Sequence, residues 1–328
     1  MSVDFPEFAS AAVPTSCGDV FVRHAGKSAA EPVFFVHGLG GESLDWSRVA
    51  NLLADRFDCY AIDLPGFGES PPPSDHDLSI DAHARAVVDA IAGLGRGPVH
   101  LVGNSLGGAV ATRVAAEHPE HVRSLALISP AMPDLRPNIW TSQLLVALVP
   151  VVGPWIVRRL MSGNPERMAK QVVAVCFGSP RAITVAQWEA EVEAVRRRSG
   201  LVHSSVVYRA SLRALVSEYL QPGRRRLWRQ AEQVTVRTLV VYGGRDKLVD
   251  ARMARRARNT FPKARVLVMP DAGHVAQLEF PEQLADLLDG FYEDLARPLD
   301  QGMTKRHGTV EAKAGATFEV APVVRRPS

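Results

Sequence analysis

Residues 99–108, VHLVGNSLGG, are the part of the sequence most informative about the fold. It opens on a short apolar run, Val99–Val102, which predicts a buried β-strand. It leads into a helical segment that runs from Leu106 to about Glu117 and ends before a proline. Between the two lies a G-x-S-x-G pattern, residues 103–107, which places Ser105 on a sharp turn from strand to helix. Glycines suit such a turn because side chains beside the serine would clash there.

This turn predicts a nucleophile. The Ser105 hydroxyl is presented at the carboxyl end of the strand, and the backbone N–H of Leu106 points into the same space from the start of the helix. We therefore expect Ser105 to be catalytic and Leu106 to supply one oxyanion donor. A serine that only caps a helix is the alternative, which the motif alone leaves open. The strand before it and the helix after it favour catalysis.

The surrounding sequence predicts further strands, which would form a sheet with the strand before Ser105. Short apolar runs at Val33–Val36, Cys59–Ile62 and Leu125–Ile128 are closed by glycine, proline or polar residues and predict further buried strands. A helix over Ile80–Leu94, capped by Ser79, lies between two of them. Strands that alternate with helices predict an α/β fold with a parallel sheet. Asp19–His24 is expected to add an antiparallel edge strand.

The second half of the chain predicts an insertion. Residues 131–233 contain no convincing strand, and helices are expected from Ser179-Pro180 to about Arg197 and over 199–220. Strands return at 238–242 and 264–269, and a last helix begins at 280–282. We therefore expect a core of residues 1–130 and 234–298, a helical cap of residues 131–233, and a flexible tail of residues 299–328. An apolar patch at 318–324 leaves room for that tail to dock locally.

A glycine-rich turn follows the first parallel strand, at His37-Gly38-Leu39-Gly40-Gly41. Such a turn can aim a backbone N–H at the reaction space of the serine, and Leu39 is the expected second oxyanion donor. His37 is expected to organise the loop rather than to titrate during the reaction. An ordinary turn at a strand end is the alternative for this loop.

The acid and the base are expected after the last two strands. Asp246 follows the strand at 238–242, and His274 lies in the loop before the last helix. The chain order Ser105, Asp246, His274 is the order of triads on α/β sheets. Histidine suits a base for a serine hydroxyl because its pKa lies near neutral pH, and a carboxylate fixes its tautomer. Asp250 and Asp271 are the rival carboxylates, each farther from the strand end.

These segments together resemble the α/β-hydrolase superfamily, in its capped, lipase- and esterase-like branch. The matching segments are residues 37–40, the run Asp63-Leu64-Pro65-Gly66-Phe67-Gly68-Glu69-Ser70, and residues 103–108, 244–246 and 273–274. The resemblance spans about residues 19–296. It implies a mostly parallel eight-stranded sheet, a helical lid after the sixth strand, and no cofactor. The sequence departs from many relatives at Asn104, where they have histidine, and at Asp250, where they have proline.

Composition excludes several other classes of protein. The chain has 328 residues, of which 46% are hydrophobic and 22% charged, so it can bury a core. A formal charge of +3 gives no reason to expect nucleic-acid binding. Three cysteines are too few for a disulfide scaffold, suggest no zinc site and fit a reducing compartment. The start of the chain, residues 1–16, carries no secretory signal pattern, so a cytoplasmic location is expected.

Three further features allow other interpretations. The uncharged stretch 139–157 is interrupted by prolines and a glycine, which favours a buried or interfacial helix over a membrane span. The His/Asp cluster at residues 75–83 is interpreted as a solvated loop rather than a metal site. The basic run 224–226 is expected to be a solvated face, with attraction to anionic lipid as the alternative. Four bulky side chains are expected to pack within the lid: Trp140, Trp155, Met161 and Phe177.

The sequence therefore predicts a serine hydrolase that cleaves ester bonds through an acyl-enzyme on Ser105, with no metal or cofactor. The apolar segment 144–156 in the cap suggests a lipophilic small-molecule substrate and leaves peripheral membrane contact through the cap open. Hydrolysis of a carbon–carbon bond in a diketone by the same triad is one alternative. A hydrolase-like binding protein without turnover is another. The acyl and alcohol groups of the substrate and the oligomeric state are not predicted.

Overall fold

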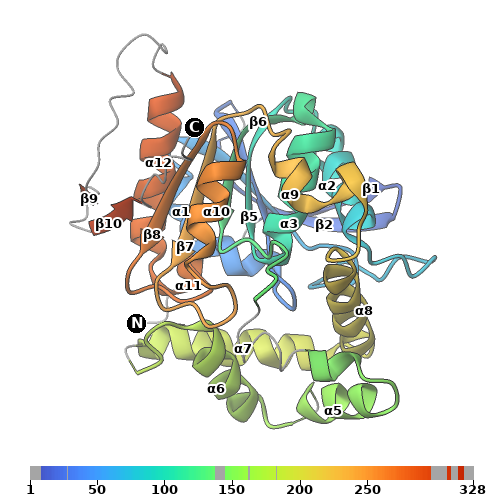
Figure 1. Ribbon diagram of the computed structural model, residues 1–328. Coiled ribbons are helices and arrows are strands. Elements are labelled where there is room, and N and C mark those ends of the chain that lie inside the picture. Colours follow the sequence, from blue (N-terminus) through green and yellow to red (C-terminus); the bar gives the residue numbers. More distant parts are fainter. Residues whose placement is uncertain are drawn as a thin grey trace.

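The computed structural model describes residues 9–27, 29–136, 145–161, 163–181, 183–296, 309–311 and 317–320. Its centre is a ten-stranded sheet of order β1-β2-β4-β3-β5-β6-β7-β8-β10-β9 (Figure 1). The strands are β1 Ala9–Thr15, β2 Gly18–Gly26, β3 Glu31–Val36, β4 Phe57–Ile62, β5 Val99–Asn104, β6 Val122–Ile128, β7 Thr238–Gly243, β8 Ala264–Met269, β9 Thr309–Glu311 and β10 Thr317–Val320.

The strands from β4 to β8 pair in parallel, as the short apolar runs predicted. Every residue of β4, β5 and β7 is buried, which is the pattern of strands covered on both faces. The inserted helices follow β6, the sixth strand, in agreement with the family resemblance. The expected α/β architecture, a mostly parallel sheet with helices inserted after the sixth strand, is therefore confirmed, with ten strands where eight were expected.

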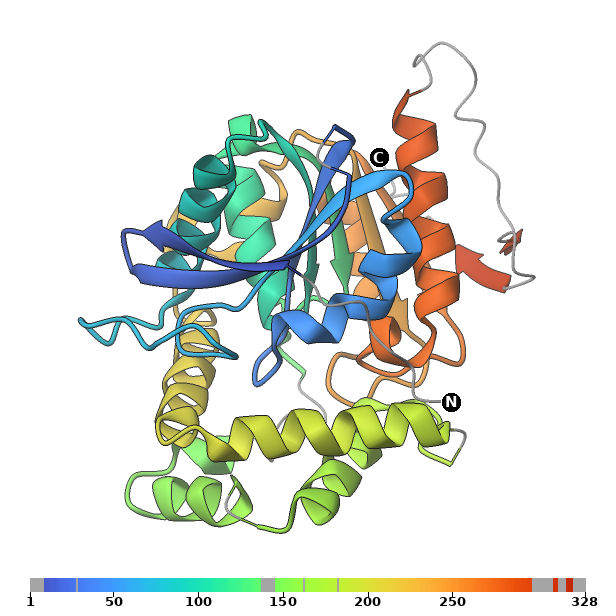
Figure 2. The ribbon, with the colours of Figure 1, turned by 180° about the vertical axis from the view of Figure 1, so that it is seen from behind.

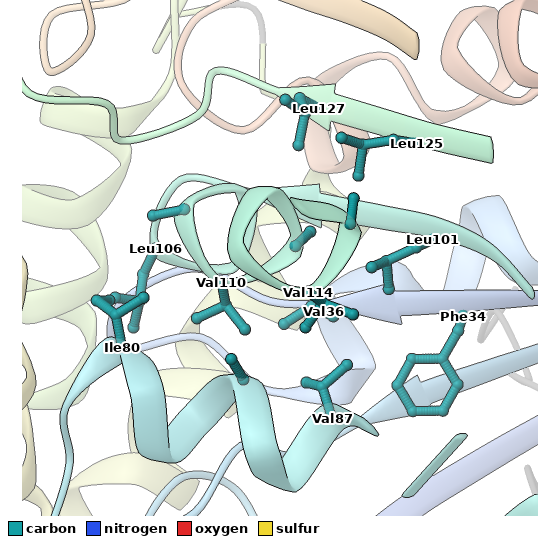
Figure 3. Close-up of a cluster of buried hydrophobic side chains, with 14 of the residues drawn as sticks. Phe34, Val36, Ile80, Val87, Leu101, Leu106, Val110, Val114, Leu125 and Leu127 are labelled. Atoms are coloured by element: carbon teal, nitrogen blue, oxygen red, sulfur yellow. The ribbon is translucent and has the colours of Figure 1, made fainter. Parts of the chain in front are cut away.

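One face of the sheet is covered by α2 Ile80–Leu94, α3 Leu106–Glu117, α9 Leu227–Ala231 and α10 Met253–Thr260. Figure 3 shows Ile80 of α2 beside Leu106 of α3, and Val114 of α3 near Val36 of the sheet. Ser79 caps α2 by accepting a hydrogen bond from the N–H of Ala82, as its sequence predicts.

The opposite face is covered by α1 Ser47–Leu53, α11 Ala276–Glu279 and α12 Pro281–Ala296. The short 3₁₀ helices η1 Ser43–Trp46 and η2 Pro119–His121 lie in the loops before α1 and β6. This second apolar cluster joins α1 and α12 to the sheet through Phe35, Leu239 and Leu288, among others. The sheet thus lies between two layers of helices, and the carboxyl ends of its parallel strands all lie on the same side.

The helices inserted after β6 include η3 Leu145–Leu148, α5 Val152–Met161, α6 Pro165–Cys176, α7 Val185–Gly200, α8 Ser204–Ser217 and η4 Gly223–Arg225. Figures 1 and 2 show α5, α6 and α7 lying across one end of the sheet, while α8 leads back toward α2 and α9. The loop after β8 reaches the same end, since it hydrogen-bonds to the last residue of α6.

Two helix boundaries in this region differ from those expected. Ser179-Pro180 does not start a helix; α7 begins at Val185 because Thr184 and Gln187 form a capping box there. The next helix, α8, begins at Ser204 rather than 199, since α7 continues to Gly200 and a turn follows. Glu193 and Arg197, four residues apart on α7, form an ion pair at 3.9 Å.

The two sheet edges also differ from expectation. The strand expected at 19–24 is antiparallel but lies inside the sheet, between β4 and the strand β1 that sequence analysis missed. Within the tail that was expected to be flexible, β10 pairs with the edge of β8, through Glu319 with Val268 and Val320 with Leu267, and β9 pairs with β10. An unpaired edge of β8 supplies the backbone groups that such a strand needs.

The expectation that four bulky side chains pack within the cap is only partly met. Phe177 is buried, but Trp155 is 67% exposed, so that interpretation was wrong for Trp155. Residue 140 and the side chain of residue 161 lie outside the described residues, as do residues 139–144 of the uncharged stretch. Over the described part of the chain, the helices are too short or too polar to cross a membrane.

Candidate active site

Ser105 stands on the predicted turn between β5 and α3. Its backbone is in an unusual conformation for a residue other than glycine, with φ 53° and ψ −115°. The glycines beside it are required by contact: a Cβ on Gly103 would lie 2.3 Å from the Gly107 carbonyl oxygen, and one on Gly108 would lie 2.8 Å from Pro130 Cβ. The turn therefore holds the Ser105 hydroxyl at the carboxyl edge of the sheet.

His274 and Asp246 meet over the same edge, from the loops after β8 and β7. His274 Nδ1 lies 2.9 Å from Asp246 Oδ2. The other carboxylate oxygen, Oδ1, accepts hydrogen bonds from the N–H groups of Leu248 and Val249 at 2.8 and 2.9 Å. Burial acts to raise the pKa of Asp246, but His274 and these hydrogen bonds outweigh it and hold the pKa below its ordinary value. Asp246 is thus kept as a carboxylate against the imidazole.

The rival carboxylates are engaged elsewhere. Asp250 pairs with Arg252 at 3.0 Å, and Asp271 pairs with Arg245 at 2.6 Å. Both side chains are also far more exposed than that of Asp246. Asp246 is the carboxylate that the structure brings to His274.

The glycine-rich loop after β3 packs directly on the nucleophile turn. A Cβ on Gly38 would lie 3.2 Å from Ser105 Cβ, and one on Gly107 would lie 2.4 Å from the Val36 carbonyl oxygen. No described residue accepts a hydrogen bond from the N–H of Leu39 or of Leu106. Both groups are therefore available as donors beside the turn, as an oxyanion hole requires.

His37 holds the shape of this loop. Its Nε2 accepts a hydrogen bond from the N–H of Leu64 at 3.0 Å, so its Nδ1 carries the proton and donates to the Gly38 carbonyl at 2.7 Å. Burial is the main cause that lowers the pKa of His37, which favours this neutral form.

One contact of a complete triad is not formed. No hydrogen bond joins the Ser105 hydroxyl to His274 in this structure, although both residues are described. Asn104, the residue before Ser105, links the nucleophile turn to the His274 loop. Its Nδ2 donates to the His274 carbonyl at 3.0 Å and to the Ile128 carbonyl at 3.0 Å. Gln277 supports Asn104 by donating to its Oδ1 at 3.2 Å. Serine–histidine hydrogen bonds are often long before substrate binds.

The His274 loop is also clamped to the inserted helices, which sequence analysis missed. The N–H of His274 donates to the Cys176 carbonyl at 2.7 Å. The Glu279 carboxylate accepts from the N–H of Gly273 at 2.7 Å and from the N–H of Gly178 at 2.8 Å. Burial is the main cause that raises the pKa of Glu279, to about 7. No motif signals this group, since its partners are backbone atoms 6 and 101 residues away.

A second attachment joins α7 to the oxyanion loop. Arg198 donates to the Gly40 carbonyl at 2.6 Å and to Glu191 at 2.9 Å. Arg197 beside it pairs with Glu42 at 2.7 Å. Burial is the main cause that raises the pKa of the neighbouring Asp45 to about 7. The loop that carries Leu39 is therefore held by side chains of the inserted helices.

Several residues of the other candidate sites make structural contacts. In the cluster at 75–83, Asp81 pairs with the buried Arg113 at 2.7 Å and Asp77 caps the chain before α2 by accepting from the N–H of Ser79. Over the described residues, no three His, Cys, Asp or Glu side chains converge as a metal site would need. In the basic run, Arg225 lies 3.4 Å from Asp81.

The chain matches a known protein family and several known proteins. A family model described as alpha/beta hydrolase fold matches residues 31–281. The chain is 30% identical over 259 residues to the dihydrolipoyllysine-residue acetyltransferase component of the acetoin cleaving system of Cupriavidus necator, covering 79% of this chain and 63% of that protein. The chain thus spans less than two thirds of that relative.

Two further relatives match over more of their own length. The chain is 26% identical over 279 residues to Lipase 1 of Psychrobacter immobilis, covering 81% of this chain and 78% of the lipase. It is 28% identical over 292 residues to the 2-hydroxy-6-oxo-6-(2'-aminophenyl)hexa-2,4-dienoic acid hydrolase of Metapseudomonas resinovorans, covering 83% and 87% of the two chains. One relative is a lipase and the other a hydrolase of a dienoic acid, so similarity alone does not choose between these activities.

Proposed function

The chain belongs to the α/β-hydrolase fold family, and we propose that it is a serine hydrolase that cleaves carboxylic ester bonds through an acyl-enzyme on Ser105. The single observation that carries this proposal is the 2.9 Å contact of His274 with Asp246 over the edge that presents Ser105 on its strained turn. Residues 1–130 and 234–298 are the proposed catalytic core, and residues 131–233 its proposed cap.

In the proposed reaction the Ser105 hydroxyl attacks the ester carbonyl carbon while His274 takes its proton. The negative charge on the carbonyl oxygen is stabilised by the N–H groups of Leu39 and Leu106. His274 then protonates the leaving alcohol. In the second half, His274 activates a water molecule that releases the acid and restores Ser105. Asp246 stays ionised and stabilises the imidazolium, which is consistent with its lowered pKa.

We propose a small lipophilic ester as the substrate. The apolar cap segment suggested it, but six side chains of residues 145–155 are exposed on the cap, so the support for an acyl group comes from a relative. The similarity to a lipase is consistent with an acyl substrate.

The proposed location is the cytoplasm, because Cys17, Cys59 and Cys176 are all free thiols, as expected in a reducing compartment.

The experiment that tests the site is covalent labelling with a fluorophosphonate. The wild-type chain is expected to label, Ser105→Ala to lose the label, and His274→Ala to label far more slowly. Asp271→Asn is the matched control, because Asp271 is an exposed carboxylate in the loop that carries His274 and should leave labelling unchanged. Labelling that survives in Ser105→Ala would exclude this serine as the nucleophile, and no labelling of the wild type would favour a binding protein without turnover.

Carbon–carbon bond hydrolysis is the second candidate, favoured by the similarity to a hydrolase of a 2-hydroxy-6-oxo-dienoate. The two activities are separated by comparing p-nitrophenyl esters of increasing acyl length with a 2-hydroxy-6-oxo-dienoate under the same conditions. We expect kcat/KM to be higher for the esters and to rise with acyl length. A higher kcat/KM for the dienoate would replace the ester proposal while keeping the same triad.

A further inference from the structure

The outer face of the cap carries an unusual group of exposed apolar side chains. Six of them fall within the 11 consecutive positions 145–155, which cover η3, the turn after it and the start of α5, with exposed fractions between 43% and 85%. They are Leu145, Val146, Val149, Val151, Val152 and Trp155. Monomeric proteins expose single apolar residues routinely, but rarely gather them in this way. We call these six side chains, together with Arg158 and Arg159, the η3–α5 surface.

Among the described residues, this surface is left exposed because η3 and α5 pack through other side chains. Ala147 and Val157 are buried against Leu212 of α8, which attaches η3 and α5 to the rest of the cap. Figures 1 and 2 both show α5 at the outer end of the cap, away from the sheet. The exposed residues therefore lie outside the contact that joins η3 and α5 to α8.

The charges of the segment are of one sign. Residues 145–161 contain Arg158 and Arg159 and no acidic residue. Both arginines are exposed and lie in the last turn of α5, one turn beyond Trp155. Apolar residues with a tryptophan and adjacent arginines form the pattern of helices that lie in the interface of a bilayer. The apolar side chains enter the acyl boundary, and the cations contact headgroups.

From this surface we infer that the η3–α5 face docks on a lipid bilayer that contains anionic headgroups. Charge selects the occupant, because a neutral bilayer or a second copy of this chain offers no excess of negative charge to Arg158 and Arg159. Trp155 supplies the largest apolar side chain of the face and an indole N–H suited to the interface. Docking there leaves the core and its sheet on the water side.

The test is binding of the full chain to phosphatidylcholine vesicles with and without phosphatidylglycerol, at low salt. Ser105→Ala protein is used throughout, so that binding is read without turnover and does not depend on the proposed reaction. Binding is expected only with phosphatidylglycerol and is expected to fall as salt is raised. Trp155→Ser should weaken it about tenfold, and Arg158→Gln/Arg159→Gln about twentyfold.

Two matched variants separate this face from its rivals. Val206→Ser removes an apolar side chain that is 66% exposed elsewhere on the cap, and Arg224→Gln/Arg226→Gln neutralises the basic run at η4. Both should bind like the parent protein. Equal loss in the η4 variant, wild-type affinity in Trp155→Ser, or equal binding to both vesicles would each overturn the inference. A dimer in lipid-free solution that Trp155→Ser dissociates, without vesicle binding, would assign the face to a second copy instead.

Discussion

Gly38 lies so close to Ser105 that adding one methyl group, as in Gly38→Ala, should displace the oxyanion loop or the nucleophile turn. A Cβ there would lie 3.0 Å from Asn104 Oδ1 and 3.2 Å from Ser105 Cβ, so the turn must shift by a few tenths of an ångström. We expect Gly38→Ala to lower kcat about tenfold on an ester while the chain stays folded. Steady-state kinetics with circular dichroism as the fold check would measure this.

The matched control is Gly290→Ala, in the interior of α12. Nothing lies within 4 Å of a Cβ built there, so the methyl group meets no obstacle. This variant should keep wild-type kcat and gain about 0.5–1 kcal/mol in free energy of unfolding, because alanine favours a helix over glycine. Wild-type kcat in Gly38→Ala would show that the loop tolerates displacement.

Asn104 is predicted to act as a positioning residue for His274. Asn104→Ala removes the donor to the His274 carbonyl, while the Ile128 carbonyl keeps its hydrogen bond from the Ser105 N–H. We expect kcat to fall about tenfold with KM unchanged, since substrate contacts stay and only the base loop is loosened. Separate determination of kcat and KM checks this split.

Gln277→Leu provides the comparison for Asn104. It removes the hydrogen bond to Asn104 Oδ1 but leaves the one from Asn104 to His274. Its effect on kcat should therefore be smaller, about twofold. A KM increase in Asn104→Ala that equals or exceeds its kcat decrease would instead assign Asn104 to substrate binding.

At the scale of elements, Glu279 ties the loop after β8 to the segment after α6. Its ordinary pKa of 4.5 is raised to about 7 in the folded protein, mainly by burial. Between these pH values the folded state holds a proton that the unfolded chain has lost. The stability that Glu279 contributes is therefore full below pH 4.5 and is lost as the pH rises through 7.

This sign gives a measurable pH dependence. The free energy of unfolding of the wild type, minus that of Glu279→Gln, should decrease from pH 5 to about pH 7 and level off toward pH 8 in urea denaturation. Asp45, whose pKa is also raised to about 7, is present in both proteins and cancels in the difference. A difference that stays constant or increases with pH would contradict the raised pKa of Glu279.

The elements that sequence predicts well are those that local pattern defines. Apolar runs closed by glycine or proline predict the parallel strands, and Ser79 predicts the start of α2. β1 was missed because Ala9–Thr15 is rich in alanine and contains Pro14, both weak strand formers, and pairing with β2 overrides that propensity. The start of α7 was misplaced because Ser179-Pro180 and the Thr184 capping box are competing start signals.

In the candidate site, too, sequence predicts the residues in local motifs and misses those that act through distant contacts. The residues expected to react follow from motif and chain order, so Ser105, Asp246 and His274 could be proposed before the structure. The groups that hold them could not, because Asn104, Cys176 and Glu279 act through backbone atoms that are distant in sequence. Trp155 was misjudged because an apolar helix can bury either side, and only packing against α8 decides which.

Across the whole molecule, several contacts attach the inserted helices to the core, and three of them lie at separate places. Cys176 and Gly178 meet the His274 loop, and Arg198 meets the oxyanion loop at Gly40. The third attachment is a buried charge: Arg113 of α3 binds Glu218, the residue after α8. Two attachments hold opposite sides of the candidate site and the third lies away from it, so stability and catalysis can be tested separately.

The third attachment predicts a large stability effect with little effect on the active site. Arg113 donates to Glu218 at 2.8 Å, to Asp81 at 2.7 Å and to Gln230 at 3.1 Å, and both Arg113 and Glu218 are almost fully buried. Arg113→Met leaves Glu218 buried without its partner, which costs about 3–5 kcal/mol in free energy of unfolding. Replacing both residues, Arg113→Met/Glu218→Leu, should recover most of that loss, because the pair is then replaced by apolar groups.

The pH dependence of this loss identifies its origin. Burial is the main cause that raises the pKa of Glu218, and Arg113 opposes it, so removing Arg113 raises that pKa further. The Arg113→Met variant can then relieve the unpaired charge by taking up a proton at low pH. Its deficit in unfolding free energy should therefore be smaller at pH 5 than at pH 8, as measured by urea denaturation. A deficit that is the same at both pH values would attribute the loss to packing of the arginine stem instead of to the stranded carboxylate.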